Sequence, residues 1–193
     1  MRIVIIKYNA GNIHSVRLAL RRLGVEPLVS NNPTAIESAD RVIFPGVGEA
    51  SSAMDFLIKK KLNTLLPALK QPVLGICLGL QLLAEHSEEN DTRGLSVFPA
   101  EVKKFPPKAK VPHIGWNTIS ALRGPLFKNV SDGSYVYFVH SYYATLNPWG
   151  CAQTEYILPF QSAMQKNNFF AVQFHPEKSA QVGEQILRNF LSL

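Results

Sequence analysis

The chain is organised around one stretch of sequence, Pro72-Val73-Leu74-Gly75-Ile76-Cys77-Leu78-Gly79-Leu80-Gln81. Apolar residues lead into Cys77, which lies between two glycines, and a periodic apolar segment follows. This pattern predicts a buried strand, a sharp turn and a helix. The Gly-x-Cys-x-Gly spacing matches the thiol form of a nucleophile elbow, in which glycines permit a strained turn that presents the side chain at a helix start.

Cys77 has two possible roles at this turn. A thiol at a helix N-terminus faces the positive end of the helix dipole, which favours the thiolate and nucleophilic chemistry. A small buried cysteine fits the stretch equally well, because free cysteine is among the most buried residue types. The only other cysteine is Cys151, so neither a disulfide framework nor a metal cluster is expected. We expect no metal and no cofactor.

Length and composition indicate an ordinary globular protein. The 193 residues suit a single domain, 1–193, in which 46% of residues are hydrophobic and 18% are charged. No apolar run approaches the roughly 20 residues that span a bilayer. The segment from Met1 to Lys7 is too short for a signal peptide. We therefore expect a cytoplasmic protein with no membrane partner.

The net charge of +6 raises the question of a nucleic-acid partner. The basic residues are scattered, however, and dense groups such as Lys59-Lys60-Lys61 fall at a predicted helix end or in a loop. Lysines at a helix C-terminus favour a solvated face. We expect no nucleic-acid partner, and attraction of phosphate or of an acidic protein is the alternative.

The N-terminal half alternates predicted strands with predicted helices. Strands are expected at 2–6, 25–29, 41–44 and 72–76. Helices are expected at 13–23, capped by Asn12, at 34–38 and at 49–69, the last with a break near Lys61. Shorter strands at 135–139, 151–156, 162–165 and 170–174 precede a closing helix at 180–191. The alternation predicts a parallel sheet with helices on both faces.

Ligands of such sheets bind outside the carboxyl ends of the strands. Three segments should reach that edge: the loop after Lys7, the turn Pro45-Gly46-Val47-Gly48, and Cys77. The sequence thus places the elbow where a ligand is expected.

A nucleophilic cysteine needs a base, and His175 is the best candidate among five histidines. Pro176 disfavours helix at His175, so this segment should stay extended. Residues two apart in an extended segment project to the same side, which would let Glu177 orient the imidazole. His140 is the competing base, but it lacks a carboxylate two residues on. The other histidines are expected on helix surfaces or in a strand: His14, His86 and His113.

An acyl-transfer site also needs hydrogen-bond donors for the oxyanion. The amide of Leu78, the first residue after the nucleophile, is one candidate. Gly46-Val47-Gly48 could supply a second, because glycines let a peptide turn its N–H toward a pocket. Without the elbow nearby, a Pro-Gly-Val-Gly segment is more often only a tight turn.

The pair of motifs Gly75-Ile76-Cys77-Leu78-Gly79-Leu80-Gln81 and Phe174-His175-Pro176-Glu177 resembles the class I, or triad, glutamine amidotransferases. Within that class the whole chain is similar to the glutaminase subunits of imidazole glycerol phosphate synthases. The supporting segments are 8–12, 44–48, 112–117 and 137–142. The resemblance implies an α/β fold with a mostly parallel, flavodoxin-like central sheet flanked by helices and a short-strand C-terminal half.

The resemblance also implies an activity. Glutamine would be hydrolysed to glutamate and ammonia through a cysteine thioester. The ammonia would pass to a barrel-shaped cyclase subunit that makes imidazole glycerol phosphate and an aminoimidazole carboxamide ribotide in histidine biosynthesis. The chain would then work as one half of a heterodimer.

Roles follow for the positions that match the family motifs. The catalytic residues would be Cys77 as nucleophile, His175 as acid and base, and Glu177 as its orienter. The oxyanion would be bound at Val47, Gly48 and Leu78. Glutamine would be held by Gln81, Glu89, Ser141 and Tyr142. The surface facing the cyclase would include Asn12, Trp116, Tyr137 and Lys178, although the two aromatic rings could be core residues and Lys178 a solvated one.

Two other interpretations stay open at this point. The chain could be a free-standing class I glutaminase subunit of another pathway, of the pyridoxal phosphate or anthranilate type, with the same triad and a different partner. It could also be a non-enzymatic scaffold with a relic site, although all three triad residues are present. Lys7 and the loop 90–93 depart from the family pattern.

Overall fold

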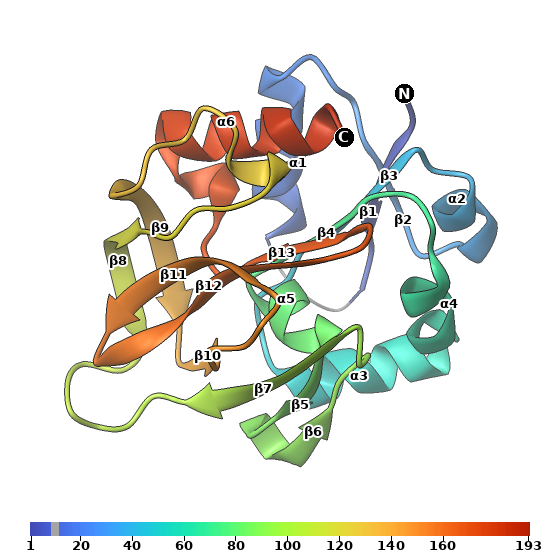
Figure 1. Ribbon diagram of the computed structural model, residues 1–193. Helices are drawn as coiled ribbons and strands as arrows, with labels where there is room; N and C mark the ends of the chain where they lie inside the picture. The colour runs from blue at the N-terminus through green and yellow to red at the C-terminus, as the bar shows by residue number, and fades with distance from the viewer. Residues whose placement is uncertain (9–11) are drawn as a thin grey trace.

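A central sheet with helices on both sides forms the body of the molecule in the computed structural model, which describes residues 1–8 and 12–193 (Figure 1). The middle of the family segment 8–12 lies outside the described residues. The strands of this sheet are β1 Ile3–Ile6, β2 Leu28–Ser30, β3 Arg41–Phe44, β4 Val73–Ile76, β5 Ala84–Ser87, β6 Thr92–Arg93, β7 Phe98–Lys104, β10 Tyr142–Ala144, β11 Gly150–Tyr156, β12 Leu158–Lys166 and β13 Phe169–Val172. A separate sheet pairs β8 His113–Ile119 with β9 Ser134–His140.

The helices fill the connections between these strands. They are α1 Ile13–Arg22, α2 Pro33–Glu37, α3 Ala50–Lys59, α4 Leu62–Ala68, α5 Leu78–Leu83 and α6 Ala180–Leu191. Short 3-10 turns are η1 Glu89–Asp91, η2 Pro125–Phe127 and η3 Pro176–Lys178. None of the helices in the described residues is long and apolar enough to cross a membrane.

The sheet order is β2-β1-β3-β4-β13-β12-β10-β7-β5-β6, with β11 added to β12. The strands from β2 to β13 run parallel, and the sheet then continues antiparallel through β12, β10 and β7. This confirms the predicted α/β class with a large central sheet flanked by helices. The C-terminal strands are not short as expected, because β11 spans seven residues and β12 nine, whereas β1 spans four. The break at Lys61 between α3 and α4 and the closing helix α6 also agree with the sequence pattern.

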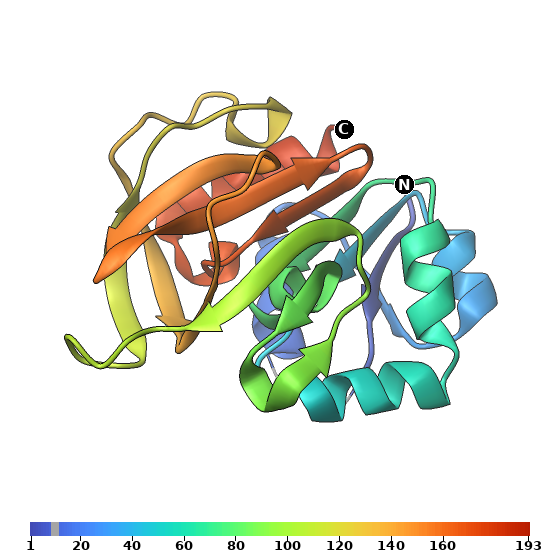
Figure 2. The ribbon, with the colours of Figure 1, turned by 60° about the horizontal axis from the view of Figure 1, so that its bottom comes forward.

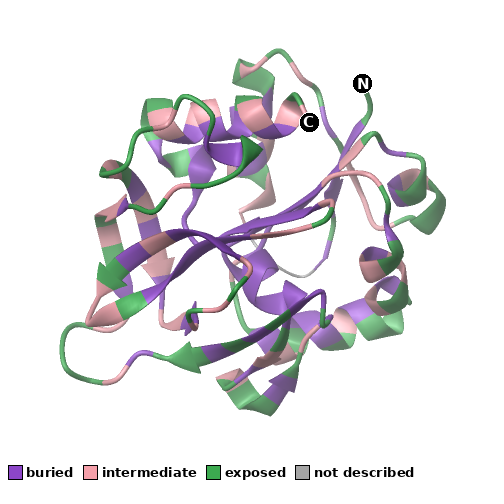
Figure 3. Ribbon diagram, viewed as in Figure 1, coloured by how far each residue is buried: buried purple, intermediate pink, exposed green. Residues whose placement is uncertain are grey.

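The core lies in two layers, one on each face of the sheet, and the buried strands separate them (Figure 3). Helices α2, α3, α4 and α5 cover one face, where Ile36 and Leu57 are fully buried. Helices α1 and α6 cover the other, where Leu20 and Phe190 are fully buried. Figures 1 and 2 show β8 and β9 at one end of the molecule, away from α2 and α4.

The predictions for His86 and for the segment after His175 were wrong. His86 lies in β5 and not on a helix, because α5 ends at Leu83 and the chain turns to pair with β7. Tertiary pairing therefore overrides the helical pattern of this segment. Glu177 lies in the turn η3, so the segment after His175 is not extended as predicted; His175 itself is extended, as Pro176 requires.

Candidate active site

Three adjacent strands bring the candidate catalytic groups to one edge of the sheet. β4 pairs in parallel with β3 on one side and β13 on the other. The turn 45–48 follows β3, Cys77 follows β4, and His175 lies just beyond β13. Because the carboxyl ends of parallel strands share an edge, residues far apart in sequence meet there.

The strain of the elbow is located in Cys77 itself. Its φ of 53° and ψ of −106° are rare for a residue with a side chain, and α5 begins at the next residue. Gly75 and Gly79 do not have positive φ. A Cβ at Gly79 would lie 1.9 Å from the carbonyl oxygen of Phe44, so this glycine allows α5 to pack on the end of β3. The spacing predicts strain at the glycines, whereas the structure has it at Cys77.

His175 and Glu177 form the predicted pair. Nδ1 of His175 lies 2.7 Å from Oε1 of Glu177, and both side chains are fully buried. A carboxylate accepts a hydrogen bond, so Nδ1 carries the proton. Nε2 of His175 is buried and makes no hydrogen bond of normal geometry with the described residues. Nε2 is therefore the ring atom left for chemistry with the thiol.

Cys77 and His175 interact electrostatically. Burial lowers the pKa of His175, but the charge of Cys77 and the contacts with Cys77 and Glu177 raise it more, to about 10. The ring is therefore protonated near neutral pH and can give a proton to a leaving group.

Asn12 lies at the N-terminal boundary of α1, but it does not cap the helix. Its φ of 69° is left-handed and its side chain makes no capping hydrogen bond. Nδ2 of Asn12 instead donates to Oε1 of Glu177 and lies 3.3 Å from Nδ1 of His175. The predicted cap was wrong, and a residue expected at the partner face also contacts the triad.

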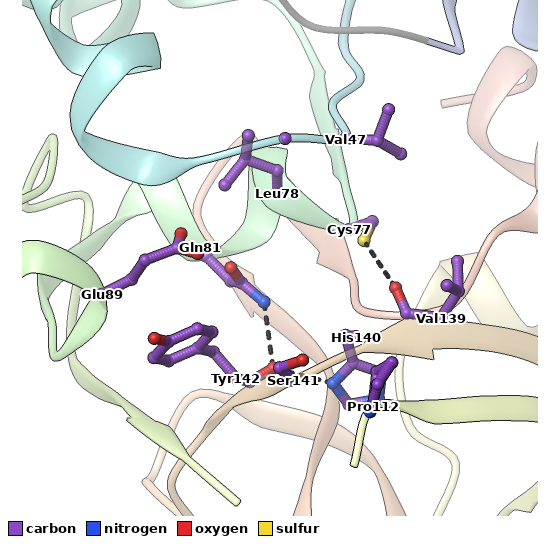
Figure 4. Close-up of a pocket in the computed structure, with 11 residues that line it drawn as sticks. Val47, Cys77, Leu78, Gln81, Glu89, Pro112, Val139, His140, Ser141 and Tyr142 are labelled. Carbon is purple, nitrogen blue, oxygen red and sulfur yellow. Dashed lines mark hydrogen bonds between the residues drawn. The ribbon is translucent and has the colours of Figure 1, made fainter.

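A pocket of about 300 Å³ opens beside the thiol (Figure 4). It is lined by Cys77 together with every residue predicted to bind the oxyanion or glutamine: Val47, Gly48, Leu78, Gln81, Glu89, Ser141 and Tyr142. Burial raises the pKa of Glu89, although a hydrogen bond from the Ala50 amide opposes this shift. The pocket thus combines a nucleophile with a carboxylate at its far side.

The amide of Leu78 is occupied in this structure. It donates to the carbonyl oxygen of Gly46 at 3.2 Å, so the Gly46 carbonyl occupies the donor that is predicted to bind an oxyanion. The buried hydroxyl of Tyr8 donates to the neighbouring Pro45 carbonyl at 2.5 Å. Burial, together with the charge of Cys77, raises the pKa of Tyr8 well above its ordinary value, so the phenol keeps its proton.

His140 is excluded as the base. Its Nδ1 lies 2.7 Å from the carbonyl oxygen of Tyr142 and its Nε2 lies 3.2 Å from Nδ1 of His113. Burial, assisted by the charges of His113 and His175, lowers the pKa of His140 to about 3, against the opposing hydrogen bond to Tyr142. Both nitrogens are engaged, and neither faces the thiol as a free acceptor.

The remaining predicted partner residues form one group. The rings of Trp116 and Tyr137 lie edge to face with centres 6.1 Å apart. Nζ of Lys178 lies 5.8 Å from the centre of the Tyr137 ring. Trp116 is 52% exposed, and Ile114 and Tyr135 on the same two strands are more than half exposed. These rings are therefore not core residues.

Sequence reasoning missed two side chains at the site. Nε2 of Gln173 lies 3.7 Å from the sulfur of Cys77, and Tyr8 holds the turn 45–48. Gln173 could have been noticed as a polar residue in an apolar strand leading to His175. The carbonyl of Val139, 3.8 Å from the sulfur, has no sequence signal because any residue has a carbonyl.

Comparison with known proteins agrees with this geometry. The family model for class I glutamine amidotransferases matches residues 4–193. The imidazole glycerol phosphate synthase subunits HisH of Bacteroides fragilis and Escherichia coli K12 are 51% and 45% identical over the full length of both chains. A glutamine amidotransferase from Thermotoga maritima shares the fold, with a TM-score of 0.69, 18% identity, and coverage of 100% of this chain and 83% of that one. The chain therefore belongs to the class I glutamine amidotransferase family.

Proposed function

We propose that this chain is the glutaminase subunit of a cytoplasmic imidazole glycerol phosphate synthase and supplies ammonia to a cyclase subunit in histidine biosynthesis. One observation supports the glutaminase activity. A cysteine at a strained elbow lies at the same sheet edge as a buried His–Glu pair, and this cysteine lines a pocket. The assignment to this synthase rests on the full-length relatives named above.

The first half of the reaction forms a thioester. The sulfur of Cys77 attacks the side-chain amide carbon of glutamine, and the carbonyl electrons move to the oxygen. When this intermediate collapses, the C–N bond breaks and Nε2 of His175 gives its proton to the leaving nitrogen, which departs as ammonia. Amides at Val47 and Leu78 would bind the oxyanion; Leu78 can do so only after Gly46 releases it.

The second half hydrolyses the thioester. His175, now neutral, takes a proton from the attacking water, and the C–S bond breaks to give glutamate and the thiolate. Glu177 keeps the Nδ1–H tautomer throughout, so Nε2 stays on the thiol side. Glu89 at the far side of the pocket suits the α-ammonium group of glutamine.

The partner is a barrel-shaped cyclase that receives ammonia through a protected path, because protonation in bulk water would remove the lone pair that reacts. The exposed apolar face of β8 and β9, with Lys178 beside it, is the proposed contact.

The test compares the two cysteines in a complex with a candidate cyclase. Cys77→Ala should abolish glutamine-dependent synthesis and leave synthesis from added ammonium salt intact. Cys151→Ala is the matched control: burial raises the pKa of Cys151 to about 12, and it lies outside the pocket, so both activities should persist. Loss of both activities in Cys77→Ala would argue against a separate glutaminase site, and labelling of Cys77 by a glutamine-like diazo ketone would support it.

A further inference from the structure

Two buried histidines make a chain of hydrogen bonds that ends at the pocket. Nε2 of His113 lies 3.3 Å from Nδ2 of Asn117, and Nδ1 of His113 lies 3.2 Å from Nε2 of His140. Nδ1 of His140 lies 2.7 Å from the carbonyl oxygen of Tyr142. The ring of His113 stacks against Tyr156 with centres 4.0 Å apart, which fixes its plane. All four imidazole nitrogens therefore have a partner.

The partners determine the tautomer of each ring. A carbonyl oxygen only accepts, so Nδ1 of His140 carries a proton and its Nε2 is an acceptor. Nδ1 of His113 must then carry a proton, and its Nε2 accepts from Asn117. The Asn117 amide is oriented independently, since its Oδ1 accepts from the Thr118 amide at 2.8 Å and its Nδ2 also donates to the Glu155 carbonyl at 3.0 Å.

Protonation of either ring would place two N–H donors opposite each other, at the His113–His140 contact or at the His113–Asn117 contact. Burial lowers the pKa of His113 to about 4 and is the largest of the effects that bring the pKa of His140 to about 3. Both rings are therefore neutral near pH 7, and the series of hydrogen bonds is intact at that pH.

The same carbonyl holds the pocket side chain. Nε2 of Gln81 donates to the Tyr142 oxygen at 3.0 Å and to Oε1 of Gln173 at 3.2 Å. Nε2 of Gln173 in turn lies 3.7 Å from the sulfur of Cys77. Figure 4 shows Gln81 and His140 approaching the Tyr142 carbonyl from different directions.

We propose that His113 and His140 are positioning residues that fix the Tyr142 carbonyl, and through it Gln81, in the geometry that binds glutamine. Each acts as a neutral Nδ1–H imidazole and takes no part in proton transfer. The inference rests on the proposed function, because glutamine is the substrate it concerns.

The first test needs no activity. Nitrogen-15 NMR of the histidine-labelled chain at about pH 7 should show both rings as Nδ1–H tautomers, with His113→Asn and His140→Asn used for assignment. An Nε2–H tautomer or a protonated ring at either position would overturn the proposal, whether or not the chain hydrolyses glutamine.

The second test compares the kinetics of His140 variants in a complex with a candidate cyclase. It relies on the different positions of the NH₂ group in Asn and Gln side chains. Asn places its NH₂ near the position of Nδ1 of histidine, so His140→Asn keeps the donor to Tyr142, whereas His140→Gln and His140→Phe remove it. We expect KM for glutamine to rise about tenfold in the Gln and Phe variants, because the Tyr142 carbonyl that holds Gln81 loses one of its two hydrogen bonds, with kcat changed less than about twofold. His140→Asn should restore most of the affinity.

Thr154→Val is the control for a purely structural effect. The buried Thr154 hydroxyl donates to the Thr118 carbonyl at 2.9 Å. Thr118 is next to Asn117, but this hydrogen bond is not part of the series that runs through His113 and His140. Its loss should lower stability and leave KM unchanged. Equal KM in wild type and His140→Phe, or a fall in kcat alone, would overturn the proposal. If wild-type protein in the complex hydrolyses no glutamine, the proposed function fails, and the NMR result still decides the tautomers.

Discussion

Cys77 and Glu177 raise the pKa of His175. The imidazole is fully buried, which alone would favour its neutral form, yet its pKa is raised to about 10. The largest raising contribution comes from Cys77, and Glu177 adds to it. The predicted triad thus holds a protonated imidazole that a carboxylate orients.

Removal of the Cys77 thiol should therefore change the pKa of His175. In Cys77→Ala the burial of the ring remains and its main charge partner is lost, so the pKa of His175 should fall well below 10. Imidazole NMR over a pH titration measures this shift. Cys151→Ala should leave the pKa of His175 where it is. An unchanged pKa in Cys77→Ala would mean that Glu177 alone holds the proton.

Tyr8 and Gly46 define a second residue-scale coupling. A Cβ at Gly46 would lie 2.0 Å from the Tyr8 hydroxyl oxygen, whereas a Cβ at Gly79 would meet the backbone oxygen of Phe44 at 1.9 Å. Gly46→Ala should lower the free energy of unfolding by about 1–3 kcal/mol, a typical cost of overpacking. Adding Tyr8→Phe removes the clashing oxygen and should recover part of this loss, but it should not rescue Gly79→Ala.

Urea unfolding of the single and double variants gives the interaction energy of each pair. A favourable interaction for Tyr8 with Gly46, and none for Tyr8 with Gly79, is the expected result. Simple additivity in the Gly46 cycle would show that Tyr8 does not restrain the turn 45–48.

At the scale of elements, β5, η1 and β7 are joined by one histidine. Nε2 of His86 lies 2.8 Å from Asp91 and its Nδ1 lies 3.1 Å from Glu101. These contacts, first that with Asp91, raise the pKa of His86. Glu89, which lines the pocket, lies between β5 and Asp91 in the sequence. The contacts of His86 with Asp91 and Glu101 therefore tether a segment of the proposed site.

The stability that His86 adds should depend on pH with a definite sign. Because its folded-state pKa is raised, the contribution is complete below the ordinary value of about 6.5 and is lost as pH rises through the folded-state pKa. The difference in Tm between wild type and His86→Gln should therefore shrink as pH rises above about 6.5. Asp91→Asn should remove most of this pH dependence, and a difference independent of pH would contradict the account.

Local patterns predicted the elements whose formation is local. The apolar run 41–44, the helix 180–191 and the elbow at Cys77 agree with the structure because periodicity, caps and spacing are properties of short segments. The contact of Asn12 with Glu177 and the strand at His86 depend on pairing across the fold. Side-chain periodicity reports burial, and it does not identify the partner strand.

Across the whole molecule, the two sheets differ in how far they are covered from solvent. The parallel strands β1, β3, β4 and β13 of the large sheet are buried between helices, while the sheet of β8 and β9 leaves apolar side chains in solvent. The hydrogen-bonded chain through His113 and His140 connects these two strands to the pocket. A partner on that face would thus contact the strands that hold the Tyr142 carbonyl.

Trp116 is the residue whose removal should weaken such a partner most. It is 52% exposed and packs edge to face on Tyr137, and exposed tryptophans at interface centres often contribute 2 kcal/mol or more. Trp116→Ala should therefore weaken binding of the cyclase at least about tenfold by calorimetry. Ile58→Ala is the matched control, because Ile58 is 55% exposed but lies on α3, at the other end of the molecule (Figure 1). If both variants bind the cyclase like wild type, the partner docks elsewhere and the apolar face of β8 and β9 needs another explanation.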